Sequence, residues 1–288
     1  MTGIAAFIGF GEAGQAFAGG APARGYDRKT DAPATRAAKR ADFERAGVAA
    51  CDSAREALAG AGAVLCVVTA DQALAAARAG AALLTRDALW LDMNSVAPAT
   101  KRAAAEAVEA AGGRYVDVAV MSPVSPKRLA TPLLLSGRHA EAGEQALRAI
   151  GFTEVRVVEG AVGAASSIKM VRSVMVKGME ALTAECVLAA ARAGVTGEVL
   201  ASLDASFPGL GWAARADYAL DRMMIHGARR AAEMEEAVKT LETLGVDPAM
   251  TRATVAWQRT IGALGIDPPQ GLAAKTKAID DIARERAA

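Results

Sequence analysis

The feature that most constrains the fold is a glycine motif that directly follows a short apolar run near the N-terminus. Residues 4–8 are apolar, and the next six residues, Gly9-Phe10-Gly11-Glu12-Ala13-Gly14, match the pattern G-x-G-x-x-G. An apolar strand, this loop and a following helix are typical of a dinucleotide-binding βαβ unit. In such a unit Gly9 makes the tight turn, Gly11 admits the pyrophosphate against the backbone, and Gly14 lets helix and strand pack closely. A glycine-rich turn without a ligand is the alternative.

Short apolar runs recur through the first half of the chain and alternate with alanine-rich stretches that carry scattered charges. The runs are residues 4–8, 64–68, 89–93, 115–120, 133–135 and 155–158. The stretches that we predict as helices include residues 53–59, 72–82 and 99–110. Continuous apolar runs separated by helices indicate parallel strands that are covered on both faces. The sequence therefore predicts an α/β domain with a Rossmann-type, mostly parallel sheet over residues 1–162.

The second half of the chain changes character near Gly160. Residues 164–193 form one uninterrupted helical pattern between Gly163 and Gly194, about 45 Å long at 1.5 Å per residue. After it we find no strand pattern, and further helices are predicted at residues 213–225, 228–244, 248–264 and 272–283. We therefore expect an all-helical second domain over residues 163–288, which begins with the long interdomain helix.

Composition limits the classes of function that are open to the chain. Its 288 residues suffice for two domains, and a hydrophobic fraction of 52% excludes a disordered chain. Lys and Arg number 33 against 32 Asp and Glu, so charge gives no reason to expect nucleic acid or a membrane surface as partner. The chain lacks a bilayer-spanning apolar run and a basic leader, which predicts a cytoplasmic protein. With 3 Cys and 2 His at no ligand spacing, we expect no metal site.

Asp27 is the residue expected to select the nicotinamide cofactor. It lies 18 residues after Gly9, close to the spacing of the acidic residue that hydrogen-bonds the adenine ribose. A carboxylate at that place repels a 2′-phosphate and favours NAD. Arg28 and Lys29 follow directly, however, and such a cationic pair is of the kind that holds a 2′-phosphate. We therefore expect NAD or NADP as the cofactor, with a preference for NAD.

Three later segments stand in a fixed order along the chain. They are residues 92–98 (DMNSVAP), 117–123 (DVAVMSP) and 163–173 (GAASSIKMVRS). Together with the glycine motif they resemble the β-hydroxyacid dehydrogenase family, which includes 3-hydroxyisobutyrate dehydrogenase and is similar to 6-phosphogluconate dehydrogenase in its helical domain. The corresponding family patterns are D-x-S-T-x-x-P, D-A-P-V-S-G-G and G-x-G-x-x-x-K-x-x-N-N. The chain departs from these patterns at Asn94-Ser95, Met121-Ser122-Pro123 and Arg172-Ser173. The resemblance implies that these positions shape the substrate pocket, so we expect an altered pocket and a divergent subgroup of the family.

The resemblance implies roles for individual residues. Lys169 matches the catalytic lysine of the family, so it is expected to act as general acid/base, with Arg172 and Ser173 on the same helix face. The expected cofactor-binding residues are Gly9, Gly11, Glu12, Ala13, Gly14, Asp27, Arg28, Thr69 and Asn94. The expected substrate-binding residues are Ser95, Met121, Ser122, Arg172, Ser173 and His226. Other readings stay open: Lys169 as a surface lysine, Ser95 as a helix cap before Pro98, and His226 as a core histidine.

These expectations describe an NAD(P)-dependent oxidoreductase that interconverts a small hydroxy acid and its oxo acid or semialdehyde. The same residues leave two alternatives open, a reductase of another small carbonyl or imine substrate and a non-catalytic dinucleotide-sensing protein. The resemblance also implies a homodimer that forms through the helical domain.

Overall fold

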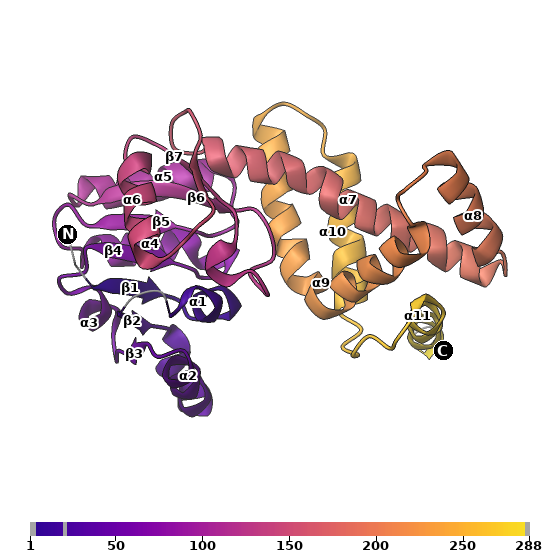
Figure 1. The fold of residues 1–288 in the computed structure, drawn as a ribbon, viewed down its shortest axis with the longest axis horizontal. Coiled ribbons are helices and arrows are strands. Elements are labelled where there is room, and N and C mark those ends of the chain that lie inside the picture. The colour runs from indigo at the N-terminus through magenta and orange to yellow at the C-terminus, as the bar shows by residue number, and fades with distance from the viewer. Residues whose placement is uncertain (1–3, 20–21, 286–288) are drawn as a thin grey trace. The chain divides into compact units, whose positions relative to one another are not determined.

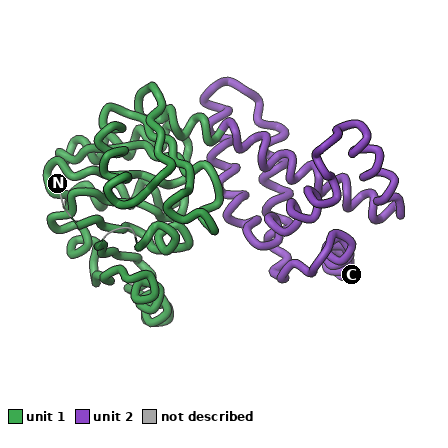
Figure 2. Tube along the Cα trace, viewed as in Figure 1, with its two compact units in different colours: residues 1–170 green, residues 171–288 purple. Residues whose placement is uncertain are grey.

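The computed structural model describes residues 4–19 and 22–285, and the chain divides into two compact units (Figure 1, Figure 2). Unit 1 comprises residues 1–170 and unit 2 comprises residues 171–288. The division falls inside the long helix α7 (Ala164–Arg192), whose first turns belong to unit 1.

Unit 1 is built on an eight-stranded sheet with the strand order β3-β2-β1-β4-β5-β6-β7-β8. The strands are β1 (Ala5–Ile8), β2 (Ala23–Tyr26), β3 (Ala49–Ala50), β4 (Ala63–Cys66), β5 (Leu89–Asp92), β6 (Arg114–Val120), β7 (Leu133–Ser136) and β8 (Val155–Val157). All neighbouring strands are parallel except β6 and β7, which are antiparallel. The predicted Rossmann-type, mostly parallel sheet is confirmed.

Helices connect these strands, and apolar side chains are buried in separate clusters. The helices are α1 (Glu12–Phe17), α2 (Pro33–Arg45), α3 (Ala54–Leu58), α4 (Ala73–Ala81), α5 (Pro98–Ala110) and α6 (Ala140–Ile150), with 3-10 turns η1 (Arg28–Thr30), η2 (Ala70–Gln72) and η3 (Arg128–Ala130). Successive residues of a strand point to opposite faces, so Phe7 belongs to one buried cluster while Ala6 and Ile8 belong to another. The continuous apolar runs of the sequence arise because both faces of the sheet are covered.

The described part of unit 2 contains helices and no strands, which confirms the predicted all-helical region. After α7 come α8 (Thr196–Ser206), α9 (Trp212–Thr243), α10 (Ala249–Gly262) and α11 (Leu272–Glu285). None of the helices in the described ranges combines the length and apolarity that a membrane crossing requires.

The prediction of two helices at residues 213–225 and 228–244 is wrong, because α9 runs through both ranges without a break. His226 and Gly227 lie between the two ranges, and Gly227 is the residue that packs against α10. A Cβ added there would lie 2.3 Å from the carbonyl oxygen of Gln258 and 2.7 Å from the Cα of Gly262, both on α10. The glycine therefore serves close packing of two helices, which offsets its cost of about 1 kcal/mol inside a helix.

Candidate functional site

The three glycines of the N-terminal motif meet different surroundings. Gly9 has a φ of +83°, and a Cβ added there would lie 2.8 Å from the carbonyl oxygen of Val67. A Cβ on Gly14 would lie 2.9 Å from a ring carbon of Phe10. At Gly11, the N-cap of α1, no described atom lies within 4 Å of the Cβ position. The fold itself therefore requires Gly9 and Gly14, whereas Gly11 leaves open space in front of the helix.

Asp27 ties the end of β2 to the glycine loop. Its Oδ2 accepts a hydrogen bond from the backbone N–H of Phe10 at 2.7 Å, and its Oδ1 accepts one from the N–H of Lys29 at 2.9 Å. The carbonyl oxygen of Phe10 accepts a hydrogen bond from the buried Lys39 Nζ at 2.8 Å. Because the N–H and the C=O of Phe10 are both bonded to side chains, the loop is fixed by the protein alone.

The remaining cofactor-binding candidates lie where neighbouring strands end. The Arg28 guanidinium donates to Gln72 Oε1 at 2.7 Å, which joins η1 to η2. Thr69 precedes η2 and is exposed, and hydrogen bonds from Thr69 and Gln72 lower the pKa of Asp71. Asn94 follows β5. Since β1, β2, β4 and β5 are parallel neighbours, these residues share the carboxyl edge of the sheet with the glycine loop.

Lys169 and Ser95 meet within unit 1. The Lys169 ammonium donates to Ser95 Oγ at 2.5 Å, and both residues are half-buried. Ser95 follows β5, and Lys169 lies near the start of α7. The reading of Ser95 as a helix cap is not supported, because the N-cap of α5 is Ala97 and makes no side-chain cap bond. The pair places a hydroxyl and an amine together at the edge of the sheet where ligands bind in doubly wound folds.

Lys101, Asp92, Asp117 and Tyr115 form a buried polar cluster in unit 1 that the sequence did not predict. The fully buried Lys101 Nζ lies 2.6 Å from the Asp92 carbonyl oxygen, 3.0 Å from Asp92 Oδ1 and 3.4 Å from Asp117 Oδ1. Tyr115 OH donates to Asp92 Oδ2 at 2.6 Å. Burial raises the pKa of Tyr115 well above its ordinary value, and the charges of Asp92 and Asp117 add to the shift. The sequence held one sign of this cluster: Asp92 and Asp117 are charged residues inside strand patterns that are otherwise apolar.

Asn94 connects this cluster to the sheet edge. Its Nδ2 donates to Asp92 Oδ1 at 2.7 Å and contacts Cys66 Sγ at 3.3 Å. A carboxylate only accepts hydrogen bonds, so this contact fixes which end of the Asn94 amide faces Asp92. The amide oxygen, Asn94 Oδ1, is buried and has no hydrogen-bond partner within the described part of the chain.

Met121 and Ser122 follow β6 and are half-buried. The backbone N–H of Met121 donates to the carbonyl oxygen of Pro132 at 2.9 Å, and Ser122 Oγ donates to that of Pro123 at 3.2 Å. Because β6 runs parallel to β5, both residues lie at the same sheet edge as Ser95. Their contact with a substrate stays a prediction.

The other three predicted substrate residues belong to unit 2. On α7, Arg172 is exposed and Ser173 is buried, whereas His226 is half-buried on α9. Their roles stay predictions.

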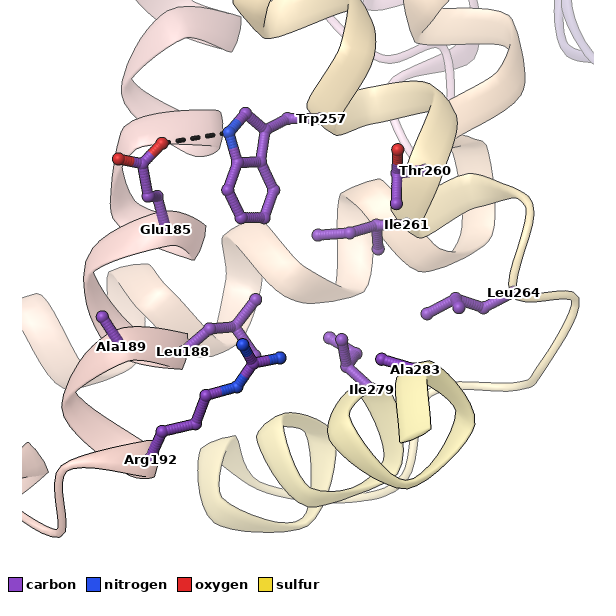
Figure 3. A pocket seen from close by; sticks show the side chains of 10 residues that line it. All are labelled: Glu185, Leu188, Ala189, Arg192, Trp257, Thr260, Ile261, Leu264, Ile279 and Ala283. Atoms are coloured by element: carbon purple, nitrogen blue, oxygen red, sulfur yellow. Dashed lines mark hydrogen bonds between the residues drawn. The ribbon is translucent and has the colours of Figure 1, made fainter. Parts of the chain in front are cut away.

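A pocket of about 380 Å³ lies within unit 2 (Figure 3). It is lined by Glu185, Leu188, Ala189, Arg192, Trp257, Thr260, Ile261, Leu264, Ile279 and Ala283. Trp257 Nε1 donates to Glu185 Oε2 at 3.0 Å at its wall. None of the predicted site residues lines this pocket.

The sequence of unit 1 matches a known family. The family described as the NAD binding domain of 6-phosphogluconate dehydrogenase matches residues 4–158, more than half of the chain. The chain belongs to this NAD-binding family. Its first unit is therefore an NAD(P)-binding domain, as the glycine motif predicts. A domain of unknown function, DUF1932, matches residues 190–261 of this family member. Among curated proteins, none matches the sequence.

Solved structures agree with this assignment. A conserved hypothetical protein from Sinorhizobium meliloti 1021 is 38% identical, with 98% of this chain and 97% of that chain covered and a TM-score of 0.75. The conserved protein MTH1747, described as of unknown function and structurally similar to 3-hydroxyacid dehydrogenases, is 29% identical, with 90% and 96% covered and a TM-score of 0.68.

The 3-hydroxyisobutyrate dehydrogenase of Mycobacterium tuberculosis, solved with L-serine, shares the fold at 18% identity, with 98% and 99% covered and a TM-score of 0.74. The predicted resemblance to the β-hydroxyacid dehydrogenases is confirmed at the level of family and fold.

Proposed function

We propose that the protein is an NAD(P)-dependent oxidoreductase that interconverts a small hydroxy acid and its oxo acid or semialdehyde. The observation that carries the proposal is the hydrogen bond between Lys169 and Ser95, located at the carboxyl edge of an NAD(P)-binding sheet. That edge is where a doubly wound sheet binds its ligands. An amine and a hydroxyl held together there are suited to proton transfer at a substrate oxygen.

The residues of unit 1 fit the dinucleotide. The open space at Gly11 permits a pyrophosphate to approach the backbone, and the Asp27 carboxylate ends β2 where the adenine ribose is recognised. The buried acceptor Asn94 Oδ1 suits a site that a bound amide or hydroxyl donor completes. When bound, the nicotinamide ring supplies the hydride acceptor or donor.

The chain itself supplies the proton chemistry. In oxidation, the neutral amine form of Lys169 takes the proton from the substrate hydroxyl and becomes the ammonium, and in reduction the ammonium gives a proton to the carbonyl oxygen. Ser95 Oγ, bonded to Lys169, orients both the amine and the reacting oxygen. We assign substrate contacts to Met121, Ser122, Arg172, Ser173 and His226 as part of this proposal.

The decisive experiment follows hydride transfer by NADH and NADPH absorbance over a panel of small hydroxy acids, semialdehydes and imines. With the best substrate, Lys169→Ala should lower kcat at least about 100-fold, the usual contribution of a general acid/base. The Kd for the cofactor should stay within about 3-fold of the wild-type value, because Lys169 acts on the substrate.

Equal turnover in Lys169→Ala would remove Lys169 from the mechanism. Tight cofactor binding without turnover of any compound in the panel would favour the dinucleotide-sensing alternative. Turnover of imines alone would favour the alternative reductase.

We also propose that NAD is preferred over NADP. The Asp27 carboxylate is held at the end of β2 by two backbone N–H groups, so a 2′-phosphate would meet a fixed negative charge. Fluorescence titration with NADH and NADPH tests this preference. Asp27→Asn removes the negative charge and keeps one acceptor oxygen. The Kd for NADPH should therefore move closer to the Kd for NADH in this variant. A wild-type preference for NADPH would contradict the assignment.

A homodimer formed through unit 2 is a further part of the proposal. Met175 and Leu182 are exposed and lie seven residues apart on α7, so they share one helix face, and Met250 of α10 is 71% exposed. Exposed apolar side chains of this size favour a protein interface. Light scattering should give twice the mass of the 29.4 kDa chain, and Leu182→Glu should shift the mass toward that of one chain.

A further inference from the structure

Lys101 is a fully buried cation that the proposed mechanism does not use. It lies on α5, and its ammonium contacts oxygens of two buried carboxylates, Asp92 at the end of β5 and Asp117 on β6. Tyr115 of β6 also faces this group through Asp92. A charged side chain loses its hydration on burial, so it is tolerated only with close partners of opposite charge. The burial of Lys101 therefore depends on both aspartates, and the burial of the two aspartates depends on Lys101.

One of the two aspartates, Asp92, holds the backbone next to Ser95. Asp92 Oδ1 accepts a hydrogen bond from the backbone N–H of Asn94 at 3.0 Å and another from Asn94 Nδ2 at 2.7 Å. These bonds form an Asx-type turn that fixes how the chain leaves β5. Ser95 is the next residue, so the orientation of the Asp92 carboxylate sets where the Ser95 hydroxyl lies.

The other aspartate, Asp117, holds the start of α7, the helix that carries Lys169. Asp117 Oδ2 accepts hydrogen bonds from the backbone N–H of Gly163 at 3.1 Å and of Ser166 at 3.0 Å, and from Ser166 Oγ at 3.0 Å. These bonds satisfy free N–H groups at the start of α7. Lys169 lies three residues beyond Ser166, so the Asp117 carboxylate sets the position of the helix turn that carries Lys169.

We propose that Lys101 is a positioning residue that holds Ser95 and Lys169 at hydrogen-bonding distance by fixing the carboxylates of Asp92 and Asp117. Its role in turnover rests on the proposed function, whereas its effect on the Lys169–Ser95 contact does not. Without the ammonium, two like charges remain side by side in the interior and repel each other. The turn before Ser95 and the first turn of α7 then lose their common anchor.

The first test variant is Lys101→Met, which keeps the length of the side chain and removes its charge. Because it leaves two unneutralised carboxylates, Lys101→Met/Asp117→Asn serves as the second variant. There the Asn oxygen still accepts from the start of α7, and the interior carries one charge fewer. Circular dichroism and thermal unfolding identify which variants are folded. Where the single variant does not fold, the double variant is compared with Asp117→Asn alone, so that the difference between them reports the loss of Lys101.

The readout independent of turnover is the acylation rate of Lys169 by acetic anhydride, measured by peptide mass spectrometry. Lys277 of α11, whose side chain is 75% exposed, serves as the reference in each protein. In folded Lys101 variants we expect the rate at Lys169 relative to Lys277 to rise at least about 3-fold, because the amine loses its bond to Ser95. Where turnover is found, kcat should fall at least about 10-fold with the cofactor Kd unchanged.

A matched control is available in unit 2. Lys275 is also a buried lysine between two aspartates, 2.6 Å from Asp217 Oδ1 and 2.9 Å from Asp221 Oδ1. Lys275→Met should lower thermal stability and leave both the relative acylation of Lys169 and kcat unchanged. An unchanged acylation rate in folded Lys101 variants, or the same change in Lys275→Met, would overturn the positioning role. Absence of turnover with increased acylation would contradict the proposed function and leave the positioning role standing.

Discussion

The ammonium of Lys169 donates a hydrogen bond to the hydroxyl of Ser95 at 2.5 Å, across 74 positions of sequence. One partner follows the fifth strand of the sheet and the other lies near the start of α7. A buried cluster centred on Lys101 holds the backbone on both sides of this contact. The pair is therefore anchored by the interior of unit 1.

Replacing Ser95 tests the contribution of this bond. In Ser95→Ala the amine loses its oriented partner, so kcat should fall about 10- to 100-fold while the cofactor Kd stays near the wild-type value. Ser95→Thr keeps a hydroxyl and should stay within about 5-fold of wild type. Steady-state kinetics together with fluorescence titration of NADH give both quantities. Wild-type turnover in Ser95→Ala would show that the bond has no part in catalysis.

Two glycines of the N-terminal motif should respond differently to a methyl group. The Cβ of Gly11→Ala enters open space, so the unfolding free energy should change by less than about 1 kcal/mol, while cofactor affinity should fall at least 10-fold. The Cβ of Gly14→Ala would lie 2.9 Å from the Phe10 ring, and that ring stacks on Phe43 at a centroid distance of 4.0 Å.

Gly14→Ala should therefore lower the unfolding free energy by about 1–3 kcal/mol, the usual cost of overpacking. Urea denaturation and NADH titration separate the two effects. An unchanged affinity in Gly11→Ala would argue against a dinucleotide at this loop.

Two glycines inside helices of unit 2, Gly227 and Gly178, should also respond differently to an added methyl group. Gly227→Ala would place a Cβ 2.3 Å from the carbonyl oxygen of Gln258, so α9 and α10 must separate, and the unfolding free energy should fall by about 1–3 kcal/mol. Gly178→Ala on α7 meets Thr254 Oγ1 only at 3.8 Å and should raise stability by up to about 1 kcal/mol through helix propensity. Thermal unfolding distinguishes the two; equal effects would contradict the close α9–α10 contact.

The stability of the protein should fall at alkaline pH because of Cys66. Burial raises the pKa of the Cys66 thiol from 9.0 to about 12, and the Asp92 charge adds to the shift. The folded state therefore keeps the thiol proton between pH 9 and 12, whereas the unfolded chain releases it. The stabilisation that the protonated Cys66 thiol gives the folded state is fully present below pH 9 and is lost as the pH rises toward 12. At pH 10.5 the unfolding free energy should have fallen by about 2 kcal/mol through this group.

Cys66→Ala isolates this contribution. Unfolding free energies measured by urea at pH 8.5 and 10.5 should fall by about 2 kcal/mol less in Cys66→Ala than in wild type. An identical fall in both proteins would show that the thiol ionises equally in the folded and unfolded states.

Local sequence patterns predicted the elements whose burial is fixed by their own composition. The runs that became β1, β4, β5 and β6 are mostly apolar because helices cover the sheet on both faces, and Asp92 and Asp117 are the acidic exceptions in β5 and β6. Strand β2, which lies between β3 and β1, has no such run: it contains Arg24, whose guanidinium donates to the carbonyl oxygen of Ala57 at 2.8 Å. The antiparallel direction of β7 also leaves no mark in its composition.

By itself the sequence determined the glycine loop, the parallel sheet, the long helix and the family, because each is recognised from short segments in which neighbouring residues carry the pattern. Only the tertiary structure decided which distant polar groups meet. Lys101 in an alanine-rich helix gives no sign of burial until Asp92 and Asp117 come together beneath it. The sequence likewise gives no sign that Gly227 packs closely against α10. Desolvation and close packing depend on neighbours from elsewhere in the chain, and the fold alone supplies them.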